Sequence, residues 1–181
     1  MKVICLMSKS AAGKSTLIKN IRSMYDIHEV KSYTTRDVRK DDKNDINTHV
    51  FVDNYFWEQN KDKAIAVYHS PKGYTSWTDI NSFDKDKVNL YAIDSVCANN
   101  IFYPYCKENG IDVVCVYLDI DETERKRRWL TREGSLDKFS DEHHLGKEHL
   151  KDISPNNLYV CSSSQTAMIA ILSILKGEIY I

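Results

Sequence analysis

The chain has 181 residues, with 25 Lys and Arg against 26 Asp and Glu and a formal net charge of −1. This length suits one α/β domain with a small insertion, and the charge balance argues against a protein that binds long polynucleotides. No run of about 18 apolar residues is available to span a membrane. The five cysteines show no CxxC spacing and lie mostly in apolar runs, which predicts buried free thiols and a cytoplasmic protein.

Continuous apolar, β-branched runs without polar alternation predict parallel strands that are covered on both faces. These runs cover residues 3–7, 88–93 and 113–118, and a further core strand is expected at 28–30. Amphipathic patterns predict helices at 15–24, 121–132 and 165–175. Strands that alternate with helices predict a doubly wound α/β fold with a parallel sheet.

The sequence changes character in two places, which predicts two additions to the core. Residues 32–83 are polar and aromatic, with short strand-like pieces at 49–52 and 64–68, and are expected to form an inserted lobe. The aromatic run at 55–57 is expected to be the small core of that lobe. Residues 133–151 are rich in charge and histidine and are expected to be a mobile segment or an exposed helix. The core would then comprise residues 1–31, 84–132 and 152–181.

The strongest chemical signal is Ser8-Lys9-Ser10-Ala11-Ala12-Gly13-Lys14-Ser15-Thr16, between the first predicted strand and the first predicted helix. It matches a P-loop except that Ser8 replaces the first glycine, and its strand–loop–helix order favours phosphate binding over a simple turn and helix cap. Lys14 would reach the β- and γ-phosphates of ATP, and the Ser15 hydroxyl would bind Mg²⁺. The residues expected to bind ATP are Ser10, Ala11, Ala12, Gly13, Lys14, Ser15 and Thr16.

An acidic residue, Asp94, follows the apolar strand that begins at residue 88. Open α/β sheets bind ligands at the carboxyl ends of their strands, so this carboxylate is a candidate for contact with the metal or the acceptor. The alternative is an ordinary helix N-cap before Ser95.

Two arginines three residues apart, Arg36 and Arg39, follow the hydroxyl-rich run that begins at Ser32. Two guanidinium groups can hold a phosphate dianion by forked hydrogen bonds. Taken alone, such a segment is also typical of a solvated loop.

The order of these features resembles the guanylate kinases. The resemblance rests on the P-loop, the run Ser-x-Thr-Thr-Arg-x-x-Arg, the polar lobe, the strand that ends in Asp, and an arginine-rich helix before a charged segment. It implies a P-loop kinase with a nucleoside monophosphate (NMP)-binding lobe at about 32–83 and a lid at about 133–151.

The resemblance also implies roles for single residues. Arg36 and Arg39 would grip the acceptor phosphate, and Ser32 would contact the base. His49 falls where the family usually has a phosphate-binding tyrosine, and Tyr74 lies near the position of a second such tyrosine. In Arg128-Trp129-Leu130-Thr131-Arg132, the two arginines would reach the ATP phosphates. The implied catalytic residues are Lys14, Arg36, Arg128 and Arg132, with Ser15 and Asp94 holding Mg²⁺ and with Asp94 also at the acceptor.

The sequence departs from the family pattern mainly on the acceptor side. Residues 40–45 replace a glycine and a glutamate, Ala66 falls where the family has its guanine-reading glutamate, and Lys72-Gly73-Tyr74-Thr75-Ser76 replaces Tyr-Tyr-Gly-Thr. His143, His144 and His149 lack a matching Cys or carboxylate set, so they are expected to be solvated lid residues.

The sequence therefore predicts a kinase that moves the γ-phosphoryl group of ATP to GMP or dGMP, with only a modest preference for guanine. Two alternatives stay open: a kinase of a different (deoxy)nucleotide, and a non-catalytic guanylate-kinase-like binding module. Its partners would be small-molecule substrates, with no membrane and no polynucleotide, and the chain would be a monomer or a homodimer.

Overall fold

A five-stranded parallel sheet forms the centre of the computed structural model, which describes residues 1–38, 48–137, 139 and 146–177. Its strand order is β2-β7-β1-β8-β9, and every neighbouring pair is parallel. The strands are β1 (Lys2–Ser8), β2 (His28–Val30), β7 (Val88–Ala92), β8 (Asp112–Leu118) and β9 (Leu158–Cys161). The predicted core strands are thus confirmed, with end points shifted by one residue or so.

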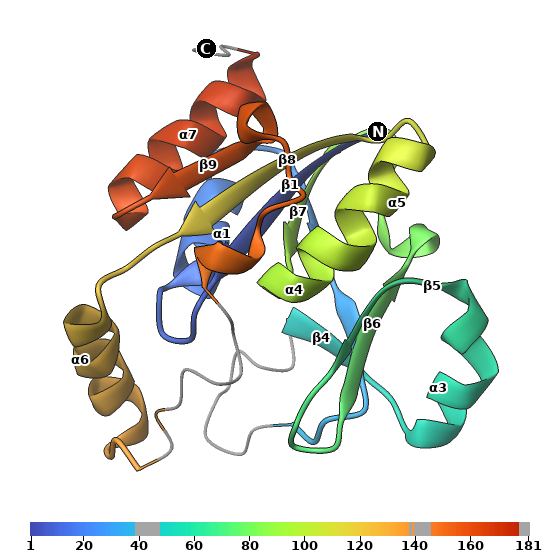
Figure 1. Ribbon diagram of the computed structural model, residues 1–181, viewed down its shortest axis with the longest axis horizontal. Coiled ribbons are helices and arrows are strands. Elements are labelled where there is room, and N and C mark those ends of the chain that lie inside the picture. The colour runs from blue at the N-terminus through green and yellow to red at the C-terminus, as the bar shows by residue number, and fades with distance from the viewer. Residues whose placement is uncertain (39–47, 138, 140–145, 178–181) are drawn as a thin grey trace.

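Side chains of the central strand β1 enter two hydrophobic clusters, one on each face of the sheet. Val3, Cys5 and Met7 belong to one cluster, and Ile4 and Leu6 belong to the other. Because side chains alternate along a strand, a strand without polar residues requires cover on both faces. The helices supply that cover, which confirms the predicted doubly wound α/β class (Figure 1).

Two layers of helices flank the sheet. The helices α1 (Lys14–Arg22) and α7 (Ser164–Lys176) pack on one face. On the other face lie α4 (Ser95–Cys97), the π-helical segment η3 (Ala98–Phe102) and α5 (Tyr103–Glu108). All five cysteines are buried and free, as expected.

The helix α6 (Glu122–Glu133) follows β8 and projects past the end of the core sheet (Figure 1). Asp121 caps its first turn by accepting hydrogen bonds from the backbone N–H groups of Thr123 and Glu124, and Gly134 ends it with a φ of 73°. Short 3₁₀ turns, η4 (Lys147–His149) and η5 (Pro155–Asn157), precede β9. Within the ranges that the structure describes, none of the helices is long and apolar enough to cross a bilayer.

A second, mixed sheet lies inside the predicted 32–83 insertion, with the strand order β4-β3-β6-β5. Its strands are β3 (Ser32–Thr34), β4 (His49–Phe51), β5 (Ala64–His69) and β6 (Thr75–Asp79), and only β3 and β4 are parallel. The helix α3 (Asn54–Asn60) lies on its outer side (Figure 1). The turn η1 (Lys61–Lys63) follows α3, and the turn η2 (Ile80–Ser82) follows β6.

The outer face of this second sheet is aromatic. Trp77 is 2% exposed, and its ring lies 5.4 Å from that of Tyr33 and 4.7 Å from that of Trp57. Phe56 joins the same group at its edge and is 38% exposed, so the predicted lobe core is borne out only for Trp57, which is partly buried. The prediction was wrong for Tyr55, which is 73% exposed because it lies on the solvent side of the short helix α3.

Candidate functional site

The P-loop connects β1 to α1 at the carboxyl end of the central strand. Gly13 has a φ of 100° and Ala11 a φ of 61°, so two residues of the loop adopt the left-handed conformation. A side chain at Gly13 would also meet Arg128, whose Nη1 lies 3.2 Å from the position of a Cβ. The glycine is therefore required both by its backbone conformation and by the close approach of α6.

Lys14 lies folded back into the loop in this structure. Its Nζ donates to the Ser8 carbonyl oxygen at 3.1 Å and to the Ser8 hydroxyl at 2.9 Å. The serine that replaces the first glycine thus gives Lys14 an extra acceptor. Burial lowers the pKa of Lys14 to about 8, and the negative charge of Asp94 opposes that shift.

Asp94 follows β7, and the structure bears out the N-cap alternative, while its contact with metal or acceptor stays a prediction. It is the N-cap of α4, because its carboxylate accepts from the backbone N–H groups of Val96 at 2.9 Å and Cys97 at 3.2 Å. Its charge also acts on Lys14, so the cap lies close to the P-loop. A capping carboxylate held beside the loop is preorganised for charge interactions with ligands there.

Arginines of α6 hold the P-loop from outside the sheet. Arg128 donates from Nη1 to the Ala12 carbonyl oxygen at 2.7 Å and from Nε to Glu124 at 2.8 Å. Hydrogen bonds from Arg127 and then from Arg128 lower the pKa of Glu124 to about 2, so this carboxylate stays ionised. Arg128 therefore contacts the backbone of the loop and is positioned by Glu124, while its expected contact with the ATP phosphates stays a prediction.

A second arginine of α6, Arg125, was not predicted from the sequence to lie at the site. It is 2% exposed, and its Nη1 lies 3.4 Å from the Ser10 carbonyl oxygen. Its spacing of three residues from Arg128 puts both on one side of the helix, which is the signal that could have found it. The guanidinium of Arg132 packs over the Trp129 ring at 4.9 Å, and its expected contact with the ATP phosphates stays a prediction.

The inner face of the second sheet is lined by hydroxyl groups. Thr34 pairs with Ser76 at 2.8 Å, and Ser32 pairs with Thr78 at 3.1 Å. The Thr78 hydroxyl in turn lies 2.6 Å from the Tyr91 hydroxyl of the core strand β7. These side-chain bonds join the lobe to the core sheet and orient the hydroxyl face toward it.

Arg36 lies at the end of β3, next to this hydroxyl face. Its Nη1 donates to the Asp37 carbonyl oxygen at 2.9 Å, and the guanidinium lies 5.3 Å from the centre of the Phe51 ring. Its backbone N–H donates to Thr34 Oγ1 at 3.3 Å. Arg39, which is expected to act with it, lies outside the described residues.

The other predicted acceptor residues lie along the same lobe. His49 is opposite Ser32 in the β3–β4 pairing, and its Nδ1 lies 2.8 Å from the Thr48 hydroxyl. The Tyr74 ring lies 6.5 Å from the Tyr68 ring, and Tyr68 was not singled out in the sequence.

Among the described residues there is no group of three or more His, Cys, Asp or Glu side chains that could hold a metal. His149 is beside Glu148 at 3.8 Å, and His143 and His144 lie outside the described residues. A P-loop needs fewer protein ligands, because phosphates and water complete the shell of Mg²⁺. The hydroxyl of Ser15 and the carboxylate of Asp94 are oxygen donors of the kind that Mg²⁺ prefers, so they fit the ion.

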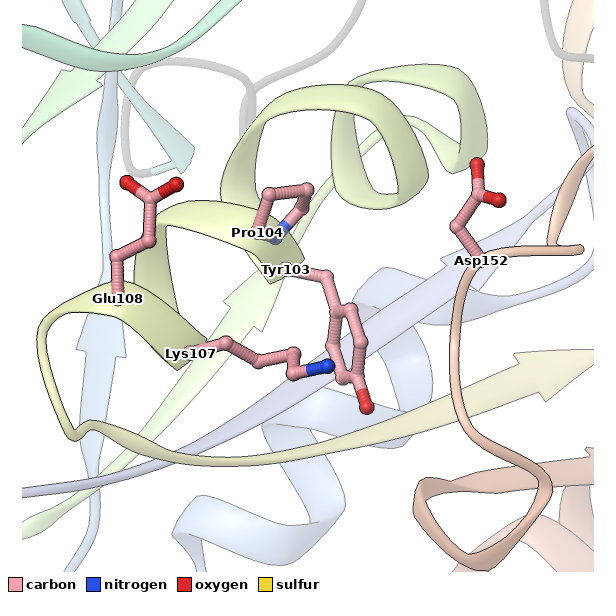
Figure 2. Close-up of a pocket in the computed structure, with 5 residues that line it drawn as sticks. All are labelled: Tyr103, Pro104, Lys107, Glu108 and Asp152. Atoms are coloured by element: carbon pink, nitrogen blue, oxygen red, sulfur yellow. The ribbon is translucent and has the colours of Figure 1, made fainter.

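A separate open pocket of about 320 Å³ lies against α5, and none of the predicted site residues lines it (Figure 2). Two of its polar groups have partners within the fold: the Tyr103 hydroxyl accepts from the Ser154 N–H at 3.2 Å, and Asp152 accepts from Asn99 at 2.7 Å. Lys107 lies over the Tyr103 ring. This pocket lies where α5 packs against the segment before η5.

Comparisons with known proteins identify the fold. No protein-family model and no curated protein matches the chain. Among solved structures, the guanylate kinase from Anaplasma phagocytophilum matches with a TM-score of 0.60 and 19% identity, over 99% of this chain and 86% of that one. A deoxyadenosine kinase from M. mycoides with bound dATP matches with a TM-score of 0.44 and 14% identity, over 97% of this chain and 100% of that one.

The chain therefore has the fold of the P-loop nucleoside monophosphate kinases. The similarity to the guanylate kinase structure extends over nearly the whole chain.

Proposed function

We propose that this protein is an ATP-dependent nucleoside monophosphate kinase that transfers the γ-phosphoryl group of ATP to GMP or dGMP. The observation that carries the proposal is the place of strand β7, which leads to Asp94. β7 pairs with β1, the strand before the P-loop, and its Tyr91 hydroxyl lies 2.6 Å from Thr78 of the hydroxyl face, so the loop and a separate polar face lie on neighbouring elements. A phosphoryl donor and an acceptor need such neighbouring sites.

In the proposed reaction an oxygen of the acceptor phosphate attacks the γ-phosphorus, and the bond to the β-phosphate oxygen breaks. The products are ADP and a nucleoside diphosphate. The acceptor phosphate is already ionised, so no general base is required, and the work of the protein is positioning and charge stabilisation. Bound Mg²⁺ would neutralise charge on the β- and γ-phosphates, with Ser15 and Asp94 as its protein ligands.

The chain's own residues divide this work. Lys14 would turn from Ser8 to the phosphates, while Arg125 and Arg128 hold the loop through its carbonyl oxygens. Arg36 and Arg39 would orient the acceptor phosphate by forked hydrogen bonds. Arg132 would have to leave the Trp129 ring to reach a phosphate.

The division of the chain into parts belongs to the same proposal. Residues 32–83 would be the NMP-binding lobe and residues 133–151 the lid, around a core of 1–31, 84–132 and 152–181. Closing the lobe and lid would exclude water that otherwise competes as acceptor.

A second candidate is a kinase of a different (deoxy)nucleotide. Ala66, which falls at the family's guanine-reading position, is 1% exposed and carries no acceptor for guanine N–H groups. A non-catalytic binding module is disfavoured, because the Lys14-Ser15 pair on which the phosphate chemistry depends is intact.

The test is ADP formation from ATP with Mg²⁺, measured without acceptor and with each ribo- and deoxynucleoside monophosphate. We expect turnover with GMP or dGMP and little without an acceptor. Turnover with another base alone would establish the second candidate. ADP formation that does not depend on any acceptor would contradict kinase activity toward nucleotides.

A further inference from the structure

The guanylate kinase resemblance assigns recognition of the guanine base to the position of Ala66. In this protein that position is buried. Ala66 is 1% exposed and belongs to the hydrophobic cluster that also contains Cys97 and Ala98. Its side chain offers neither a polar atom nor an exposed surface to a base. A contact with the base must therefore come from elsewhere on the inner face of the second sheet.

Tyr68 is the next residue of β5 on that same face. Side chains two residues apart in a strand share a face, roughly 7 Å apart. The pairing agrees, because Ala66 is opposite Thr78 and Tyr68 is opposite Ser76 on β6. Both partners belong to the hydroxyl face, whereas the intervening Val67 is opposite Trp77 of the aromatic face.

Three further observations connect Tyr68 with the site. Its side chain is only partly buried, so it is accessible from the inner face. Its ring lies 6.5 Å from that of Tyr74, one of the expected acceptor residues. Burial first, and then the charges of Tyr74 and Asp94, raise the pKa of Tyr68 against the lowering effect of the Ser70 hydroxyl. The phenol thus stays protonated at neutral pH and can both donate and accept a hydrogen bond.

We propose that Tyr68 is a specificity-determining residue, whose hydroxyl contacts the polar edge of the acceptor base in place of the missing glutamate. This inference rests on the proposed function. A glutamate accepts only, and so selects bases that present N–H groups. A hydroxyl can pair with either an N–H group or a ring nitrogen, which explains chemically why the preference for guanine should be modest.

The experiment compares the wild-type chain with Tyr68→Phe, which removes one oxygen and keeps the ring. Tyr55→Phe is the matched control, since it makes the same change on the exposed helix of the same lobe. For each protein, kcat and KM are measured for the panel of nucleoside monophosphates and for ATP. Calorimetric titration with each monophosphate measures acceptor binding independently of turnover.

We expect Tyr68→Phe to change the ratio of kcat/KM between bases by about fivefold, the equivalent of one neutral hydrogen bond. The change should arise in KM for the acceptor, with KM for ATP unchanged and with Tyr55→Phe behaving as the wild type. An unchanged order and ratio of bases in a Tyr68→Phe variant that turns over would overturn this inference alone. Wild-type protein that neither binds nor phosphorylates any monophosphate would overturn the proposed function and this inference with it.

Discussion

The two sheets of this protein contribute to the proposed site in different ways. The core sheet is apolar on both faces, and its site is formed by loops at its carboxyl edge, above all the P-loop. The second sheet is apolar on one face only, and the hydroxyls of its other face belong to the proposed site themselves. Thr34 and Thr78 on this face are buried, so only changes at its partly buried side chains, such as Ser32, Ser76 and Tyr68, could alter specificity without disturbing a buried core.

The two regions also differ in how far they depart from the guanylate kinase pattern. The P-loop differs at Ser8, and there the new hydroxyl accepts a hydrogen bond from Lys14. The acceptor lobe differs at several positions, of which the buried Ala66 removes a charged group altogether. Under the proposed function, the chain keeps the residue pattern of a phosphate donor site and changes that of the acceptor site, and each prediction below separates the two.

The largest expected effect concerns the aromatic face that supports the acceptor lobe. Trp77→Ala should lower the free energy of unfolding by about 3–5 kcal/mol, because it leaves a cavity among Tyr33, Phe56 and Trp57. Chemical denaturation measures the loss. Tyr55→Ala, at a side chain that is 73% exposed, should cost no more than about 0.5 kcal/mol. Equal losses in the two variants would show that the face does not support the lobe.

On the donor side, Lys14→Ala should reduce ADP formation by about 10²–10³-fold, as expected for loss of an electrostatic stabiliser of the transferring group. The thermal unfolding midpoint should stay near that of the wild type. The control is Lys19→Ala, at an exposed lysine of the same helix. Near-normal turnover of Lys14→Ala would reject the P-loop assignment.

Arg36→Ala should act on the acceptor side alone. Loss of a charge-assisted hydrogen bond of about 1.5–3 kcal/mol should raise KM for the monophosphate by roughly 10–100-fold while KM for ATP changes little. Arg36→Lys keeps the charge and loses the forked geometry, so it should recover only part of the affinity. A change confined to the ATP dependence would mean that the donor and acceptor sites have been exchanged.

The smallest effect is a pH dependence of ATP binding. Because the pKa of Lys14 is lowered to about 8, its ammonium group loses its proton as the pH rises through 8, and the attraction for the phosphates falls. Calorimetry should therefore show weaker ATP binding at pH 9 than at pH 7. A Lys14→Arg variant, whose guanidinium stays protonated, should lack this decline. An equal decline in both proteins would assign it to another group.

The sequence alone predicted the elements whose character is local. Uninterrupted apolar runs indicated the buried parallel strands, and the small residues before Lys14 indicated a phosphate loop between a strand and a helix. The hydroxyls and Arg36 after β2 indicated a polar segment. The predicted strands and the strand–loop–helix order are confirmed because periodicity and loop composition depend on neighbouring residues only, while phosphate binding by the loop stays a prediction.

Only the tertiary structure decided which elements meet. Arg125 lies beside Ser10 although 115 positions separate them. The pairing of β5 with β6 places Tyr68 opposite Ser76, and the charge of Asp94 contributes to the raised pKa of Tyr68. The exposure of Tyr55 depends on the rotation of the seven-residue helix α3 about its axis, which decides which side chains face Trp77. Such contacts are set by strand register and by packing between distant segments, and the local sequence pattern of one element does not specify the side chains of another.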